Sequence, residues 1–202
     1  MAEARRTTER MKTRLADALW DCLAERPVGE ISVGDVIEAA EVSRGSFYYH
    51  FDDLDQLLAW AIRQEVMNSD RKGHSFALLL ARTEPSGDPL VQRAIARVCL
   101  LLDKGGMSPV FDVALDAMRE VWVAVLEPEG GRLPDGVVAQ LEYAVGGSVG
   151  MLARANGSTE AKRRVSSAFI RACHRTLVER VAAELDVSAA ELVVRFERVG
   201  GA

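Results

Sequence analysis

The sequence contains few of the residues that build metal sites and redox centres. Among 202 residues there are only three histidines and three cysteines, namely His50, His74, His174, Cys22, Cys99 and Cys173. No His-x-x-x-His or Cys-x-x-Cys spacing occurs, so we predict no metal site. Each cysteine falls in an apolar segment of helical period, which favours reduced core thiols; a redox-sensing thiol is the alternative.

Signatures of common enzyme classes are missing as well. The chain has no phosphate-binding loop, no dinucleotide-binding glycine pattern and no nucleophile elbow. Its aspartates and glutamates sit mostly at polar helix positions, where exposure to solvent is the default explanation. We therefore predict a protein that binds rather than catalyses, and one without a cofactor.

Long apolar runs are also lacking. Glu142 and Arg154 leave too short an apolar run around the glycines between them to cross a bilayer. The N-terminus is polar and charged, without the apolar stretch of a secretion signal. We predict no membrane contact and a cytoplasmic location.

Apolar residues are nevertheless abundant, and their spacing is helical. They make up 49% of the chain, enough for more than one helical core. Glycine- and proline-rich breakers leave helix-length segments at 89–104, 109–126, 135–155 and 159–184, and none alternates like a strand. The predicted fold is all-α, and the sequence shows no internal repeat.

The first third of the chain carries two helices with apolar faces. Residues 11–23 repeat apolar side chains at helical spacing, and Pro27 stops that helix. A second apolar stripe runs through residues 54–66, where Asp52 or Asp53 can cap the helix start. These two helices flank a more unusual segment.

Between them, two short helices are predicted with a tight turn. Ser32 and Asp35 form a capping-box pattern at the start of the first short helix. The chain then turns over Glu41 and Val42, and Ser43 caps the second. This arrangement is typical of a helix-turn-helix.

The second short helix, residues 43–51, combines an apolar side with hydrogen-bonding groups. Phe47 and Phe51 are four residues apart and share one face. The remaining surface carries Arg44, Ser46, Tyr48, Tyr49 and His50. Arginine can donate to guanine O6 and N7, and hydroxyl, phenol and imidazole groups reach phosphates and base edges. The alternative is that the four aromatics are core residues with a polar rim.

On these residues, the segment from about Thr8 to about Ile62 resembles the TetR family of transcriptional regulators. The strongest part is the run from Val42 to Phe51, close to that family's recognition-helix signature. The resemblance implies that Ser32 and Ser46 bind phosphates, that Arg44 and Tyr48 lie nearest base edges, and that Tyr49 and His50 grip the DNA backbone. Gly45 would allow close approach to the groove, and Ser43, which begins the helix, belongs to the same predicted DNA-binding set.

Two positions depart from the family pattern. Glu41 stands where the family commonly has a turn glycine, and a non-glycine residue at positive φ costs about 1 kcal/mol. Leu54 stands where the family commonly has a lysine, which removes a phosphate contact. Asp52, Asp53 and Asp55 surround that gap with negative charge.

The charge of the chain is acidic overall, with a formal net value of −5. Its extreme N-terminus is basic, with Arg5, Arg6, Arg10, Lys12 and Arg14. Such an arm could lie along phosphates or enter a minor groove. The alternative is an ordinary disordered terminus.

The resemblance also implies two domains and a dimer. We predict a DNA-binding domain at 1–52 and an effector-binding and dimerisation domain at 53–202, joined by the long helix after Asp53. The predicted four-helix dimer interface comprises Gly146, Gly150, Phe169, Ile170, Cys173 and Leu177. Glycine inside a helix costs about 1 kcal/mol relative to alanine, and close helix approach is a natural reason for it. The alternative is that these helices pack only within one chain.

The function predicted is that of a ligand-responsive transcriptional regulator, most often a repressor in the family, which binds double-stranded DNA at a palindromic site as a homodimer. An unidentified small-molecule effector would occupy a pocket among Trp60, Met67, Phe76, Met107, Phe111, Met118 and Trp122, although each could equally be ordinary core. The alternative function is a helical protein–protein adaptor that does not bind DNA.

Overall fold

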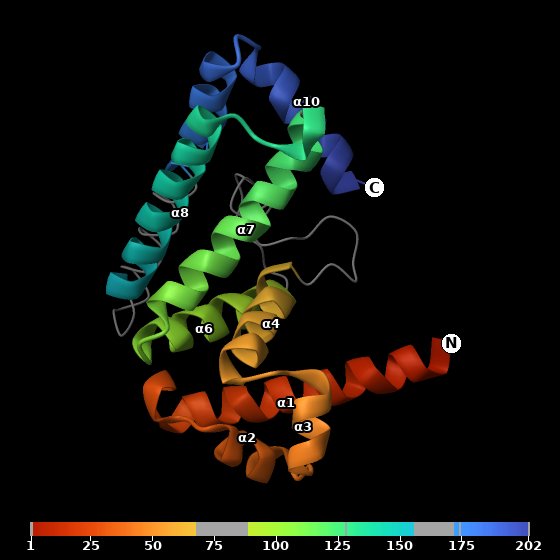
Figure 1. The fold of residues 1–202 in the computed structure, drawn as a ribbon. Helices are drawn as coiled ribbons and strands as arrows, with labels where there is room; N and C mark the ends of the chain where they lie inside the picture. Colours follow the sequence, from red (N-terminus) through yellow and green to blue (C-terminus); the bar gives the residue numbers. More distant parts are fainter. Residues whose placement is uncertain (1, 68–88, 128, 156–171, 174, 202) are drawn as a thin grey trace.

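A computed structural model describes residues 2–67, 89–127, 129–155, 172–173 and 175–201. Within these ranges every regular element is helical and no strand occurs, so the all-α prediction is confirmed (Figure 1). Two groups of helices follow each other along the chain. The first contains the short helices predicted as a helix-turn-helix, and we call it the head; the second, from α6 onward, we call the body.

The head comprises α1 (Ala2–Glu25), α2 (Val33–Ala40) and α3 (Arg44–His50), with a short 3-10 turn, η1 (Val28–Glu30), after α1. α1 ends before Pro27, as the sequence predicts, and its Leu15, Leu19 and Leu23 are fully buried. α1 packs against α2 and also contacts α3 and α4 (Leu54–Met67) (Figure 1). α4 then leads away from the head.

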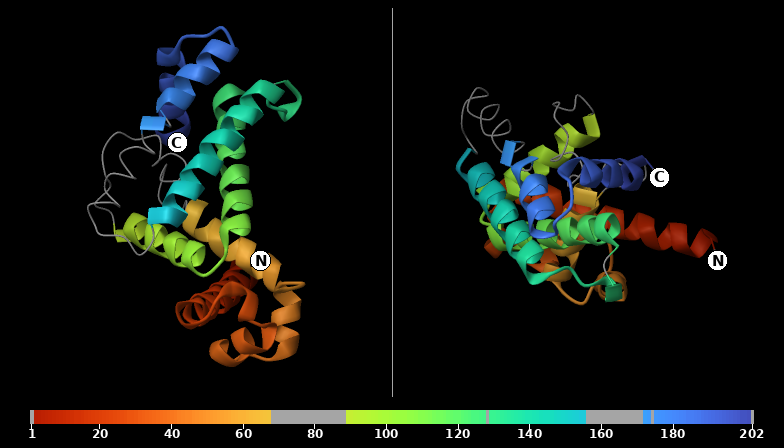
Figure 2. Two further views of the ribbon diagram at one scale, coloured as in Figure 1. Left: turned by 90° about the vertical axis from the view of Figure 1, so that its left-hand side faces the viewer. Right: turned by 90° about the horizontal axis from the view of Figure 1, so that it is seen from above.

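The body comprises α6 (Pro89–Asp103), α7 (Met107–Leu126), a short turn η2 (Glu129–Gly131), α8 (Asp135–Ala155) and α10 (Ala189–Gly201). Residues 175–184 are also helical. The two views of Figure 2 show α7 and α8 running side by side, and α7 also packs against α4 and α10. α7 is therefore the helix around which the body is arranged.

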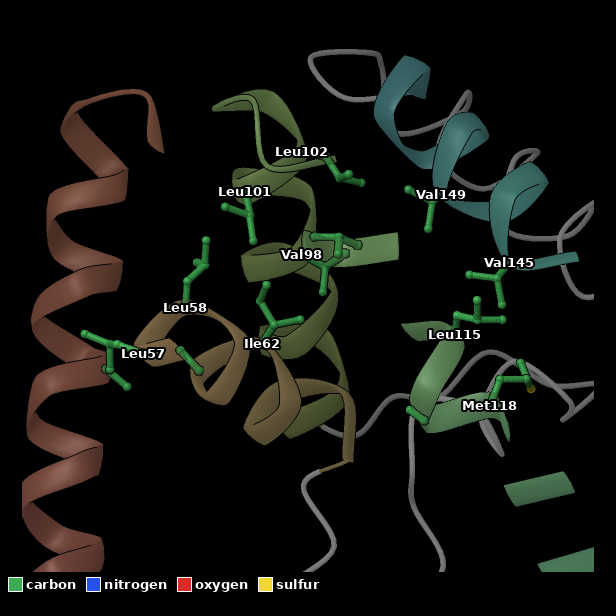
Figure 3. Close-up of a cluster of buried hydrophobic side chains, with 14 of the residues drawn as sticks. Leu57, Leu58, Ile62, Val98, Leu101, Leu102, Leu115, Met118, Val145 and Val149 are labelled. Carbon is green, nitrogen blue, oxygen red and sulfur yellow. The ribbon is translucent and has the colours of Figure 1, made fainter. Parts of the chain in front are cut away.

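Head and body share one continuous apolar core. Figure 3 shows the junction, where the side chains from α4 meet those of α6, α7 and α8. The labelled residues there are Leu57, Leu58, Ile62, Val98, Leu101, Leu102, Leu115, Met118, Val145 and Val149. All are buried. Because burial of apolar area is the main stabilising term in folding, α4 is held by both groups at once.

In addition to the shared core, a tight turn between α6 and α7 makes a backbone contact between body and head. A Cβ atom at Gly106 would overlap the buried side chain of Leu101, so a larger residue there would have to displace it. The turn brings the carbonyl oxygen of Lys104 to the backbone N–H of Val28, which donates to it at 2.9 Å. The end of α6 is thereby fixed to the loop after α1.

Two elements differ from what the sequence analysis predicts. The basic N-terminal residues are not an extended arm but the first turns of α1, which extend beyond the rest of the head (Figure 1). α10 was not predicted at all. It begins after Ser188, whose hydroxyl accepts a hydrogen bond of 3.1 Å from the N–H of Glu191. That Ser-x-x-Glu pattern is a capping signature, so the signal for this helix is present in the sequence.

Candidate nucleic-acid interface

The start of α2 is fixed by the predicted capping box. The N–H and hydroxyl of Ser32 donate to Oδ2 of Asp35 at 2.8 and 2.6 Å, and the N–H of Asp35 donates to Oγ of Ser32 at 3.3 Å. Arg26, at the end of α1, adds a hydrogen bond of 3.1 Å to the other carboxylate oxygen. The hydrogen bonds from Ser32, and then the Arg26 guanidinium, lower the pKa of Asp35 to about 2. α1 and α2 are thus joined at their adjacent ends.

The turn between α2 and α3 contains a residue at positive φ, the conformation that glycine adopts most easily. Glu41 lies in the left-handed region, with φ 51° and ψ 47°. Its N–H donates to the carbonyl of Glu38, and the N–H of Val42 donates to that of Ile37, both at 3.1 Å. These bonds close the end of α2 as a glycine cap would. The departure at Glu41 therefore leaves the turn intact.

α3 presents one face to the core and the other to solvent. The N–H of Ser46 donates to the hydroxyl of Ser43 at 3.1 Å, which confirms Ser43 as the cap. Phe47 is fully buried and Phe51 is 3% exposed. Tyr49, by contrast, is 80% exposed and Tyr48 is 48% exposed. The two phenylalanines thus pack in the core, whereas the two tyrosines lie on the surface.

The remaining residues of the predicted DNA-binding set surround these two tyrosines. Ser43, Arg44 and Gly45 are exposed at the start of α3, whereas Ser46 and His50 are half-buried. The rings of Tyr49 and His50 meet edge to face, with centroids 4.9 Å apart. Burial, and then the positive charge of Lys12, lower the pKa of His50 below its usual value. The imidazole is therefore neutral at pH 7.

Ser32 belongs to the predicted DNA-binding set but lies on α2. Its hydroxyl and N–H donors are both directed to Asp35 in the structure described above. A phosphate at this place would have to compete with that carboxylate for the hydroxyl. The phosphate contact of Ser32 stays a prediction.

Leu54, at the start of α4, is half-buried and packs against the core. The N–H of Gln56 donates to Asp53 at 2.8 Å, so Asp53 caps α4. An aliphatic side chain at position 54 contributes packing where a lysine would contribute charge. The acidic residues Asp52 and Asp55 beside it are exposed.

Comparison with known proteins supports this interpretation of the head. Residues 15–60 match the family described as bacterial regulatory proteins, tetR family. This segment is therefore similar to the tetR family. The matched region runs from the middle of α1 through the helix-turn-helix into α4.

Part of the chain is also similar to part of a curated protein. The HTH-type dhaKLM operon transcriptional activator DhaS of Lactococcus lactis subsp. lactis (strain IL1403) is 31% identical over 71 residues. That alignment covers 33% of this chain and 38% of the Lactococcus protein. The chain therefore spans less than half the length of the relative it matches.

The residues predicted to line an effector pocket are spread over several places. Trp60 packs edge to face against Phe51 of the head, with ring centroids 5.9 Å apart, and Trp122 packs against Phe196 of α10 at 4.8 Å. Met118 is buried, Phe111 is half-buried, and Met107 is 48% exposed at the first turn of α7. Phe76 and the side chain of Met67 lie outside the described residues. Trp60, Phe111, Met118 and Trp122 all belong to or pack against the continuous apolar core, and the pocket stays a prediction.

Part of the predicted dimer interface can be placed. Gly146 lies where a Cβ would contact the Phe111 ring at 3.5 Å, so it faces α7 within the same chain. A Cβ at Gly150 meets no atom within 4 Å among the described residues. Cys173 is half-buried and Leu177 is buried. Phe169 and Ile170 lie outside the described residues.

Among the described residues, no group of three or more histidine, cysteine or acidic side chains could hold a metal ion. No helix in this part of the chain is long and apolar enough to cross a membrane. Burial raises the pKa of the Cys22 thiol, which opposes formation of a reactive thiolate there.

Proposed function

We propose that the protein is a ligand-responsive transcriptional regulator that reads double-stranded DNA with α3 and acts as a homodimer. The observation that carries this proposal is the exposed surface of α3, where Arg44, Tyr48 and Tyr49 face solvent while Phe47 and Phe51 hold the helix in the core. In a helix-turn-helix, the second helix enters the major groove and its first residues contact base edges. Arg44 is the first residue of α3.

Homodimer formation is supported by one face of α8. Tyr143, Gly147 and Gly150 follow one another at helical spacing. Tyr143 is 74% exposed, and a Cβ at either glycine would meet no atom within 4 Å among the described residues. A large exposed aromatic beside small residues suits close approach of a second helix. A second copy of the chain is the occupant we propose.

A homodimer would place two copies of α3 in successive major grooves. The half-sites would then be about 34 Å apart and related by the twofold axis of the dimer. An effector bound in the body would change the spacing of the heads through α4, since α4 shares its core with both groups. A change from 1:99 to 99:1 between two spacings needs about 5.5 kcal/mol of differential binding.

We propose repression, by blocking transcription, as the direction of control. The similar Lactococcus protein is named an activator, so activation is the second candidate. A reporter gene placed behind the selected DNA site distinguishes the two, because expression falls with a repressor and rises with an activator.

The test of the whole proposal is selection of the purified chain against a random pool of duplex DNA at fixed moderate salt. Enrichment of a palindrome with half-sites about one helical turn apart supports the proposal. Sedimentation of the chain with the selected duplex gives the number of chains bound. A single chain per site would refute the homodimer, and no enrichment at all would favour the adaptor function.

Replacement of Gly147 by leucine tests the dimer face separately. If α8 meets a second copy there, the added side chain should weaken dimerisation by keeping the helices apart. Ala96, an exposed alanine on α6, provides the control as Ala96→Leu, which adds the same side chain away from the face of α8. Equal dimer dissociation constants for both variants would contradict the assignment of this face.

A further inference from the structure

The C-terminal end of α3 lies in an acidic part of the chain. Asp52, Asp53 and Asp55 follow it directly and are all exposed. Leu54 adds no charge. Because phosphates repel carboxylates, a DNA backbone passing this end of α3 needs a cation from another element.

α1 places a lysine at this point. The Nζ atom of Lys12 lies 5.6 Å from the ring centroid of Phe51 and 6.0 Å from that of Trp60. These rings pack edge to face, so the ammonium rests on an aromatic surface formed by the end of α3 and by α4. Cation–π contacts of this kind are worth about 0.5–1 kcal/mol at exposed sites and hold the cation in place.

The charge of Lys12 is available to a ligand. Lys12 is half-buried, and it forms no ion pair with any carboxylate of the described residues. Two other cations of the head are engaged, since Arg14 pairs with Glu41 and Arg26 with Asp35. A half-buried, pre-positioned ammonium loses less side-chain entropy on binding an anion than a free surface lysine does.

Lys12 also acts electrostatically on one residue of the predicted DNA-binding set. Its positive charge lowers the pKa of His50, which places the ammonium within electrostatic reach of the imidazole. The His50 ring in turn contacts the exposed Tyr49 ring. Phe51, which Lys12 contacts, directly follows Tyr49 and His50 in the chain, so Lys12 lies at the end of α3 that carries these two residues. Since His50 is neutral at pH 7, Lys12 supplies positive charge at this end of the helix.

We propose that Lys12 binds a DNA phosphate beside Tyr49 and His50, so that α1 supplies the cation for the C-terminal end of α3. This inference rests on the proposed DNA-binding function and adds a residue to it. Arg44 would act at the opposite end of the same helix, about 10 Å away along seven residues. Contacts to the DNA backbone would then come from two helices of the head, α1 and α3.

The test measures DNA affinity against salt concentration for the full chain and for Lys12→Gln, Lys12→Arg and Lys104→Gln. Each phosphate contact contributes about 0.9 to the slope of log K against log salt. We expect Lys12→Gln to make that slope shallower by about 0.9 per subunit, and to weaken selected and random duplexes equally. Lys12→Arg should retain the slope. Lys104→Gln removes one lysine charge at the α6–α7 turn and should leave the slope unchanged.

A purely structural role for Lys12 gives a different result. Lys12→Met keeps an unbranched chain against the Phe51 and Trp60 rings but removes the charge. If Lys12→Met restores the wild-type salt slope, or if Lys12→Gln lowers affinity with no change in slope, the phosphate contact is refuted while the proposed function stands. Absence of DNA binding by the unmodified chain would instead refute the proposed function together with this inference.

Discussion

The carboxylate of Glu65 in α4 accepts a hydrogen bond of 2.5 Å from Arg97 of α6. The Glu65 side chain is only 4% exposed. The same Arg97 donates to Asp17 of α1 at 3.1 Å, and its guanidinium lies 5.2 Å from the ring centroid of Trp20. One arginine of the body thus binds α1, a helix of the head, and α4, the helix that follows the head.

Replacement of Arg97 by alanine is expected to destabilise the protein strongly. Among the described residues, it leaves the buried Glu65 with only the longer contact to Arg93, at 3.5 Å. Loss of one partner of a buried ion pair costs about 3 kcal/mol or more. Denaturant unfolding measures the change in the free energy of unfolding.

Arg63 provides the matched control, because it also joins α4 to another helix through an ion pair, with Glu120 of α7. Both of those side chains are over 40% exposed, at 41% and 49%. An exposed pair contributes at most about 1 kcal/mol, so Arg63→Ala should have a small effect. Equal losses in the two variants would show that burial of Glu65 does not set the strength of its pair.

Glycine at position 41 is expected to stabilise the head. Glu41 has φ 51°, where a side chain costs about 1 kcal/mol relative to glycine. The substitution also removes the ion pair with Arg14, whose side chains are 50% and 85% exposed. That pair is worth little in water, so the backbone effect should win.

The comparison of Glu41→Gly with Glu41→Gln separates the two contributions. Glutamine loses the ion pair but keeps a side chain at positive φ. Thermal unfolding should give the glycine variant the higher Tm of the two. A glutamine variant as stable as the glycine variant would indicate that the positive φ carries no measurable strain.

Local features of the head could be predicted because their interactions are close in sequence. The capping box joins Ser32 to Asp35, and the two faces of α3 follow from residues three and four apart. The positive φ at Glu41 follows from its place in a tight turn. In each case the partners are within one or two helical turns.

Contacts between distant segments could not be predicted in this way. Glu65 and Arg97 are 32 positions apart, and Arg97 and Asp17 are 80 apart. The sequence pattern places Lys12 only in a basic terminus, because its position beside Phe51 and Trp60 depends on how α1 packs. Such pairs are determined by tertiary packing, which no local pattern in the sequence specifies.

Substitution of Arg44 and of Tyr49 should affect DNA binding differently. If Arg44 forms two hydrogen bonds to a guanine, Arg44→Ala should cost about 1–3 kcal/mol and relax preference at one base pair per half-site. If Tyr49 contacts the DNA backbone, Tyr49→Phe removes the contacting hydroxyl and should weaken all sequences more evenly. Titration against a duplex set varied at single positions separates the two patterns. If neither substitution changes binding, the recognition face is assigned wrongly.

The state of His50 should make DNA affinity depend on pH. Burial and Lys12 hold the pKa of His50 below 6.5 in the free protein, whereas a phosphate bound beside the ring would favour the protonated form. Binding would then take up a proton, and affinity should rise as the pH falls from about 7 through the pKa of the free protein.

The stability of the free protein should change in the opposite direction. His50 has a lower pKa in the folded chain than in the unfolded chain, so the free energy of unfolding should decrease as the pH falls below the pKa of the unfolded chain. Replacement by glutamine should remove the contribution of His50 to both trends while keeping a hydrogen-bonding side chain. NMR titration of the imidazole, with and without the selected duplex, measures both pKa values directly. A pKa that is unchanged on DNA binding would rule out a phosphate contact at His50.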